Sequence, residues 1–379
     1  MLKNVYITRS AKFLPNEAIS NDEMEDYLGK INQLPSKARR IVLRNNGIKK
    51  RYYVVDKQQN IHFTNAELTA EAIKNLFDEH VTSQDIQVLS VGTSTPDQLL
   101  PSHASMVHGL LKNSSVELNS SSGICCSGMN ALKFAYLSVL AGTAENAVSS
   151  GSECVSPWML NKRFDEEIEN LKELEQQPVI AFRKEFLRWM LSDGAAAFLL
   201  QNKPNENSIS LKIEWMESYS FAHEIEACMY AGADKNEEGD LIPWQHFTND
   251  DWLRKSIFSI KQDVKILDEF ILVKGVESML DALRKHEISV EEIDYFLPHI
   301  SSMYFKDKLY ESFKNAGFEI PADKWFLNLD QVGNVGSASI YLMVEELMNS
   351  EKLKTGDRIL LSVPESGRFS YAYAYLTVV

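Results

Sequence analysis

Two segments of the chain share the same order of apolar and polar positions. Residues 70–86 place apolar side chains at helical spacing, continue into a polar turn and lead into the apolar run 87–93. Residues 277–293 repeat this order without a gap, 207 positions later, and lead into the run 294–298. Apolar spacing of three and four residues is typical of an amphipathic helix, and a short apolar run is typical of a buried strand. Each segment therefore predicts a helix, a turn and a strand.

A second pair of segments keeps nearly the same spacing. Residues 123–132 open a helix that we expect to run to about Leu140, and residues 333–340 open another that we expect to run to about Met348. Alignment of the glycines that follow each opening brings together, 208 positions apart, Cys126 and Asn334. Each predicted helix is followed by an apolar run that we interpret as a strand, at residues 147–150 and 358–363.

The two repeated pairs of segments predict an α/β protein that arose by duplication. Two halves, residues 1–205 and 206–379, would pack around a pseudo-twofold axis and bring the two equivalent helix N-termini together. Cys126 and Asn334 would then face one site. The alternative, two unrelated α/β stretches that share a helix-strand pattern, stays open at this point.

Composition and charge narrow the class of protein. With 379 residues, of which 44% are hydrophobic and 10% aromatic, the chain can bury a large core, which excludes a disordered protein. A net charge of −14 argues against nucleic acid and anionic membranes as partners, although it permits a local basic patch. No run of about 18 apolar residues occurs, and residues 1–9 are typical of a strand rather than a signal peptide. We therefore expect a cytoplasmic protein.

Four cysteines offer a free thiol: Cys125, Cys126, Cys154 and Cys228. Two are adjacent and no Cys-x-x-Cys spacing occurs, so we expect neither disulfides nor a structural zinc. Cys126 precedes two small residues at a predicted helix N-terminus, where unpaired amides and the helix dipole would lower the pKa of a thiol. Its own amide could donate to an oxyanion. An inert buried thiol is the alternative.

Two polar residues complete a candidate site with Cys126. His299 directly follows the predicted strand 294–298, where a histidine can carry a proton or donate a hydrogen bond. Asn334 precedes Val335 and could equally be only the N-cap of the helix there. A cysteine and an asparagine at duplicated positions, with a histidine nearby, indicate a site that handles thioesters.

The sequence resembles the β-ketoacyl-acyl-carrier-protein synthase III branch of the thiolase superfamily. The landmarks occur in order over nearly the whole chain: Gly47–Arg51, Thr93–Asp97, Cys126–Gly128, Ser192–Ala195, Pro298–His299 and Gly333–Ser339. The resemblance implies a five-layered αβαβα fold, a homodimer and a catalytic triad of Cys126, His299 and Asn334. It also implies an oxyanion hole built from the backbone amides of Cys126, Ser366 and Gly367, and no metal or organic cofactor.

The implied reaction is a two-step Claisen condensation. Cys126 takes an acyl group from a thioester, and a second thioester then enters. His299 and Asn334 donate hydrogen bonds to its carbonyl as an enolate forms, and the enolate carbon attacks the acyl group. Neutral donors suit this step because they stabilise negative charge without quenching the carbanion.

Several departures from the family pattern bear on the substrate. Ile41 stands near the place of a tryptophan that is typical of relatives that bind CoA, and a charged loop, residues 364–369, replaces a glycine-rich one. Two aromatic-rich stretches, 157–190 and 215–252, would shape acyl tunnels or, alternatively, cover an interface. The departures resemble those of dialkylresorcinol-forming ketosynthases. A fatty-acid-initiating synthase III, a thiol hydrolase or thioesterase, and a non-catalytic synthase subunit remain the alternatives.

An acidic acyl carrier protein would need basic residues at the tunnel mouth. The candidates are Lys37, Arg39, Arg40, Arg44, Lys49, Lys50, Arg51, Lys306 and Lys308. A solvated charged face is the alternative for each of them.

Overall fold

A computed structural model describes residues 2–33, 35–36, 39–163 and 187–379. Its centre is a nine-stranded sheet whose strands form a continuous hydrogen-bonded order. In that order the strands are β13 (Tyr295–Pro298), β14 (Arg358–Glu365), β15 (Ser370–Val378), β8 (Leu211–Ser220), β1 (Tyr6–Phe13), β7 (Gly194–Gln201), β6 (Asn146–Glu153), β4 (Val88–Thr93) and β5 (Glu117–Ser122).

The sheet consists of two parts with the same pairing pattern. In the first part β4 is parallel to β6, and β7 is antiparallel to both β6 and β1. In the second part β13 is parallel to β14, and β15 is antiparallel to both β14 and β8. Two residue pairs between β1 and β8, at Tyr6 and Ile7, join the parts. This shared pattern confirms the predicted duplicated α/β fold and argues against two unrelated stretches.

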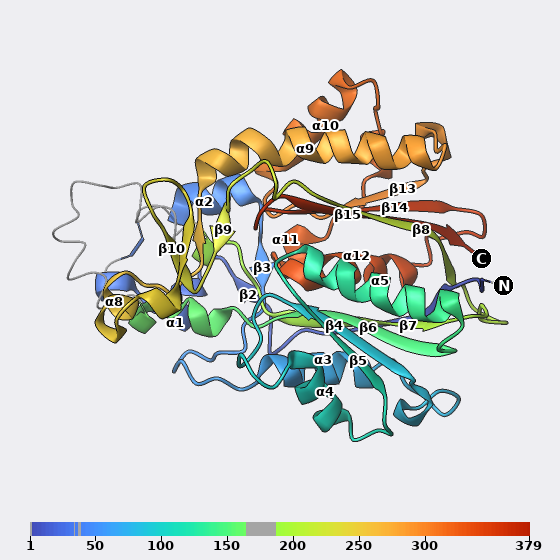
Figure 1. Cartoon of the computed structure of the whole chain (residues 1–379), viewed down its shortest axis with the longest axis horizontal. Helices are drawn as coiled ribbons and strands as arrows, with labels where there is room; N and C mark the ends of the chain where they lie inside the picture. Colours follow the sequence, from blue (N-terminus) through green and yellow to red (C-terminus); the bar gives the residue numbers. More distant parts are fainter. Residues whose placement is uncertain (1, 34, 37–38, 164–186) are drawn as a thin grey trace.

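Helices cover both faces of each part, which gives the five layers visible in Figure 1. The sheet parts fold over a middle layer, and the outer helices pack on their far faces. The outer helices are α3 (Asn65–Lys74), α4 (His103–Leu111), α9 (Val264–Lys285) and α10 (Tyr304–Asn315). The middle layer contains α5 (Cys126–Ala141), α11 (Leu329–Val332) and α12 (Ser339–Met348). The predicted αβαβα order is therefore confirmed.

The smaller elements lie mostly beyond the ends of the strands near α8 and β10 in Figure 1. They are β2 (Ile19–Ser20), α1 (Met24–Leu28), α2 (Arg39–Asn46), β3 (Lys50–Arg51), β9 (Met229–Tyr230), β10 (Ala233–Lys235), β11 (Leu241–Pro243), α8 (Asn249–Arg254) and β12 (Lys261–Gln262). Of the aromatic-rich stretch 157–190, residues 164–186 lie outside the described residues, as does Lys37.

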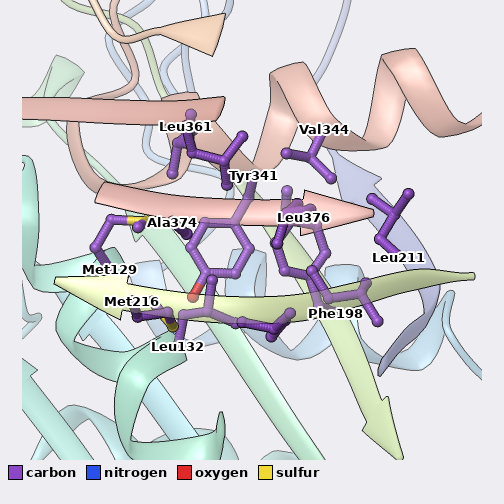
Figure 2. Close-up of a cluster of buried hydrophobic side chains, with 14 of the residues drawn as sticks. Met129, Leu132, Phe198, Leu211, Met216, Tyr341, Val344, Leu361, Ala374 and Leu376 are labelled. Atoms are coloured by element: carbon purple, nitrogen blue, oxygen red, sulfur yellow. The ribbon is translucent and has the colours of Figure 1, made fainter. Parts of the chain in front are cut away.

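The core of the middle layer joins the two halves. Figure 2 shows side chains from α5, α12 and both sheet parts meeting there. The rings of Phe198 on β7 and Tyr341 on α12 stack with centroids 4.3 Å apart. Both are fully buried, and burial of a large aromatic side chain contributes about 1.5–3 kcal/mol to stability. The middle layer thus fixes the helices that carry the predicted site.

The turns of the first repeat are equivalent in detail. Thr82 and Ser289, which are 207 positions apart, each precede a short 3-10 helix that leads into β4 or β13, and the backbone N–H of each donates to the carboxylate three residues later. The second repeat differs from the prediction. Asn334 does not cap a helix at Val335, because a 3-10 turn over Gly336–Ala338 precedes α12. The division of the chain at residues 205 and 206 stays a prediction.

Across the described ranges, no helix combines the length and the apolar character that a bilayer span requires.

Candidate active site

The N-termini of the two duplicated helices meet. A side-chain carbon on Gly128, in the first turn of α5, would lie only 2.2 Å from the carbonyl oxygen of Ser337, in the turn before α12. The Tyr341 hydroxyl donates a hydrogen bond of 2.8 Å to the carbonyl oxygen of Gly128. Only glycine permits this approach, so Gly128, two residues after Cys126, brings that cysteine close to the segment that carries Asn334.

Cys126 is the first residue of α5 and is almost completely buried. Its sulfur lies 3.3 Å from the carbonyl oxygen of Val363 and 3.6 Å from that of Ser370, on the hairpin formed by β14 and β15. Burial, with the nearby Glu365 carboxylate as a second cause, raises the pKa of the thiol well above its ordinary value. The expectation that the helix N-terminus lowers this pKa is therefore wrong, because desolvation outweighs the dipole.

His299 directly follows β13, as the sequence predicts. Its backbone N–H donates to the carbonyl oxygen of Ser362 on β14, at 2.7 Å. The side chain is buried, and burial lowers the pKa of the imidazole to about 4. The ring is therefore neutral near pH 7 and can donate a hydrogen bond without acting as a strong acid.

Asn334 is held by its backbone on both sides. Its N–H donates to the carbonyl oxygen of Met190, and its own carbonyl oxygen accepts from the N–H of Ser192. Its side-chain oxygen accepts from the N–H of Gly336 at 3.0 Å. Gly333 before it has φ of +74°, and a side-chain carbon there would lie 2.8 Å from that of Ser192. This tight turn fixes where the asparagine side chain begins.

A deep cavity reaches these residues from under α9 and α10. Its empty volume, open solvent included, is about 1050 Å³. Apolar side chains from both helices and from β15 form most of its wall, among them Leu267, Ile271, Met279, Leu309, Phe313 and Tyr373. His299 and Asn334 lie on its polar wall together with Cys125, whereas Cys126 is not among the described lining residues. The structure therefore brings the histidine and asparagine to one cavity and leaves the Cys126 thiol against the β14–β15 hairpin.

Glu153 is a buried carboxylate of this cavity that the sequence did not single out. It ends β6 and accepts hydrogen bonds from the hydroxyls of Ser94 (2.6 Å) and Thr95 (2.8 Å) and from the N–H of Ser337 (3.1 Å). Burial raises its pKa, although these hydrogen bonds oppose the shift. It thus ties the loop after β4 to the turn that follows Asn334. The sequence signal for this residue is a single acidic side chain at the end of a strand made mostly of small residues.

The predicted oxyanion hole is more crowded than a glycine-rich loop would be. The Cys126 amide donates to the Glu365 carboxylate at 2.9 Å. The Ser366 hydroxyl accepts from the side-chain amide of Gln262, and the Gly367 carbonyl accepts from the N–H of Cys228. Arg368 donates to the carbonyl oxygen of Ile225. The assignment of the Cys126, Ser366 and Gly367 amides to an oxyanion stays a prediction.

The basic candidates for carrier-protein docking differ in their exposure and in their partners. Arg51 is fully buried and donates to the side-chain oxygen of Asn21, so its assignment to a surface patch is wrong. Three others have acidic partners, at 2.8–3.0 Å: Arg39 with Glu25, Lys49 with Asp330, and Lys308 with Asp268. Lys306 is half-buried. The exposed residues near α2 are Arg40, Arg44, Lys49 and Lys50, beside the exposed Ile41.

Comparison with known proteins gives matches along the chain. The family model of the 3-oxoacyl-[acyl-carrier-protein] synthase III C-terminal region matches residues 283–375. A β-ketoacyl-[acyl-carrier-protein] synthase III from Clostridium kluyveri is 24% identical over 324 residues, which cover 83% of this chain and 84% of the relative.

Solved structures share the fold over its full extent. A tetronic acid condensing enzyme gives a TM-score of 0.75 at 18% identity, over 98% of this chain and 99% of its own. A variant of OleA from Xanthomonas campestris, solved with lauric acid and lauroyl-CoA, gives 0.73 at 19% identity, over the whole of both chains. The thiolase-like fold is therefore established independently of the site.

Proposed function

We propose that this chain, an acyltransferase like β-ketoacyl-acyl-carrier-protein synthase III, joins two acyl thioesters by Claisen condensation at Cys126, His299 and Asn334. One observation carries the proposal: a largely apolar cavity is lined by His299, Asn334 and Cys125, the residue directly before Cys126. Apolar walls suit an acyl chain, and neutral hydrogen-bond donors at the polar end suit a thioester carbonyl.

In the first step Cys126 becomes acylated. Its sulfur forms a bond to the thioester carbonyl carbon, the bond to the carrier sulfur breaks, and the thiol proton leaves with the carrier thiol. Because Cys125 lines the cavity and the Cys126 thiol rests against Val363, a change of the Cys126 rotamer would precede this step. Burial raises the pKa of this thiol, so the thiol form predominates in the resting site near neutral pH.

In the second step the acyl group moves to carbon. The second thioester becomes an enolate by loss of carbon dioxide from a malonyl group or, for a β-ketoacyl group, by transfer of its acidic α proton to water; the Cys126 thiolate released at the end of the step takes a proton back from water. His299 and Asn334 donate to its oxygen. The enolate carbon bonds to the acyl carbonyl carbon, and the bond to Cys126 sulfur breaks. The lowered pKa of His299 supports a donor that stays neutral throughout.

More specifically, we propose that the second thioester carries a β-ketoacyl chain and that the product belongs to a dialkylresorcinol-type synthesis. The length of apolar wall along α9 supports a long acyl chain, and the exposed Ile41 offers no aromatic platform for adenine. A fatty-acid-initiating synthase III is the second candidate, and the name of the Clostridium kluyveri relative favours it. Both candidates use the same three residues and differ in substrate.

An acyl carrier protein is the partner that we propose for delivery. The exposed basic residues near α2, Arg40, Arg44, Lys49 and Lys50, could attract its acidic surface despite the net charge of −14. Four buried free thiols support a reducing, cytoplasmic setting.

A second copy of the chain is the partner that we propose for assembly. β5 is the terminal strand of the sheet, and exposed apolar side chains lie along it and along the neighbouring α4, namely Leu118, Met106 and Leu110. Such an edge can be covered by a symmetric copy of itself.

The test is intact-protein mass spectrometry after incubation with acyl-CoA and acyl-carrier-protein panels. We compare wild type with Cys126→Ala and with Cys125→Ala, the matched control from the adjacent position. An acyl adduct on wild type and Cys125→Ala, but not on Cys126→Ala, supports the proposed nucleophile, and the preferred chain and carrier identify the branch. An adduct that survives in Cys126→Ala, or rapid release of the acyl group to water alone, contradicts the condensation mechanism.

A further inference from the structure

Glu365 is the last residue of β14 and lies between the cavity and Cys126. Along β14 the side chains alternate: Ser362 and Pro364 line the cavity, whereas Val363 packs into the core beside α5. Glu365 is the last residue of the strand and continues the second set, so its carboxyl group reaches the N-terminus of α5. Its side chain is 91% buried in consequence, with a relative exposure of 9%.

The contacts of this carboxylate are specific. Oε2 accepts hydrogen bonds from the N–H of Ile124 at 3.1 Å and from the N–H of Cys126 at 2.9 Å. Glycines flank both oxygens: a side-chain carbon on Gly123 would lie 3.6 Å from Oε2, and one on Gly367 would lie 3.2 Å from Oε1. Within the described ranges, no Lys, Arg or His forms an ion pair with Glu365. Burial raises the pKa of Glu365, and the two amide donors oppose this shift.

The same amide is the one that thioester chemistry at Cys126 needs. When the Cys126 sulfur attacks a thioester, negative charge develops on the carbonyl oxygen next to the residue's own N–H. The Glu365 oxygen, 2.9 Å from that nitrogen, already accepts from the donor that such an oxygen would use. Two negative oxygens cannot share one donor cheaply in a buried site, so the carboxylate and the substrate exclude each other.

We propose that Glu365 is a positioning residue that holds the resting site closed: its carboxylate occupies the amides at the start of α5, and Cys126 is acylated when the carboxylate leaves them. This inference rests on the proposed function. Glu365 acts in two separable ways. Its presence blocks the amides, and its charge disfavours a thiolate on the same residue.

Among the described residues, few titratable groups lie near Glu365. Cys125 and Cys126 face it from α5, Tyr371 and Tyr373 face Cys126 from β15, and Glu153 of β6 acts on Cys125. Arg368, three residues further on, donates to the carbonyl oxygen of Ile225. Glu365 is therefore the acidic group with the greatest influence on Cys126, after burial itself.

Two variants separate the two effects. Glu365→Gln keeps an oxygen that can accept from both amides and removes the charge. Glu365→Gly vacates the amides. The matched control is Glu345→Gln, which neutralises an equally buried acid on α12 that pairs with Lys12 at 2.7 Å. Circular dichroism and thermal unfolding of each variant identify any that does not fold.

The first measurement needs no acyl substrate: alkylation of Cys126 by iodoacetamide as a function of pH, located by peptide mass spectrometry. We expect the onset in Glu365→Gln to move by about one pH unit to lower pH, which makes alkylation roughly tenfold faster at a fixed pH below the onset. Glu345→Gln should follow wild type. Superimposable profiles for Glu365→Gln and wild type would overturn the proposal.

The second measurement is the rate of acyl transfer to Cys126. Folded Glu365→Gly should acylate faster than both wild type and Glu365→Gln, because its amides are free. A folded Glu365→Gly that acylates no faster than wild type would overturn the proposal while leaving the proposed function intact. If no variant becomes acylated although the alkylation profile shifts as expected, the proposed function fails and the contact between Glu365 and Cys126 stands.

Discussion

The hydroxyl of Tyr341 donates a hydrogen bond to the carbonyl oxygen of Gly128 at 2.8 Å and lies 2.6 Å from the Ser149 hydroxyl. One buried phenol thus connects the middle-layer helix of the second half with the helix and a strand of the first half. Because Gly128 stands two residues after Cys126, this contact couples the core to the position of the proposed nucleophile.

Tyr341→Phe should destabilise the fold without loosening its packing. The ring would still stack on Phe198, but two buried polar groups would lose their partner, at a cost of about 1–3 kcal/mol. Urea unfolding followed by circular dichroism measures this change. Stability equal to wild type would mean that another group satisfies the Gly128 carbonyl.

His299→Ala and Asn334→Ala should separate the two half-reactions. Both residues are proposed to stabilise the enolate, so acylation of Cys126 should persist while product formation falls roughly 100-fold or more. Mass spectrometry of the adduct and chromatography of the product give the two rates on the same samples. Equal losses in both rates would instead assign these residues to acylation.

The buried, neutral His299 should make folding stability depend on pH. Burial lowers the pKa of this imidazole from 6.5 to about 4 in the folded state, so the unfolded chain binds more protons between these values. Stability from this residue is therefore lost as the pH falls below about 6.5, by up to about 1.4 kcal/mol per pH unit. The measurement is the difference in unfolding free energy between wild type and His299→Asn at pH 7.5 and pH 5.

Wild type should lose more unfolding free energy than His299→Asn when the pH is lowered from 7.5 to 5. Two other buried groups titrate in the same range. Burial lowers the pKa of His103 to about 4, which affects stability in the same direction as His299. Burial raises the pKa of Asp193 to about 6, which affects stability in the opposite direction. Both are common to the two proteins and cancel in the comparison. A difference that stays constant with pH would show that His299 is not held neutral by the fold.

Gly275→Leu should shorten the acyl chain that the enzyme accepts. Gly275 lies in α9 on the cavity wall, and a side-chain carbon there would already be 3.2 Å from the Tyr371 ring. A leucine would displace buried methylenes, each worth about 0.8 kcal/mol, so loss of two should weaken labelling by a long chain roughly tenfold. Short-chain labelling should be retained.

The matched control for this variant is Gly109→Leu. Gly109 is an exposed helical glycine of α4 with open space around it, so the substitution adds the same side chain outside the cavity. Competition between long and short acyl thioesters gives the ratio for both variants. The same ratio in Gly275→Leu and in the control would show that the acyl chain does not run under α9.

The parts of the site that the sequence predicted are those with a local signal. The repeat around Thr82 and Ser289 was readable because a turn and its flanking apolar pattern lie within about 20 residues. The same holds for the segments of Cys126 and Asn334, whose helix N-termini the duplication predicts to lie together. His299 was found because a strand ends directly before it.

The parts that the sequence did not predict depend on contacts between distant segments. The direction of Glu365 is set 239 positions away, by the amide of Cys126. Arg51 looked like a member of a basic surface and is instead buried against Asn21. The sequence predicts a lowered pKa for Cys126, but the pKa is raised. A helix N-terminus is visible in a sequence, whereas the burial that outweighs its effect is not.

The two ends of the nine-stranded sheet are unequal, although the halves share one topology. At one end β5 is a full strand, whereas beyond β13 the chain makes only an isolated bridge between Phe296 and Trp325, next to a hydrogen bond from the Phe326 amide. Sheet extension by another chain is therefore favoured at a single edge. If two copies pair through β5, each uses the only long free edge of this sheet within the described residues, so growth stops at two and does not continue into a fibre.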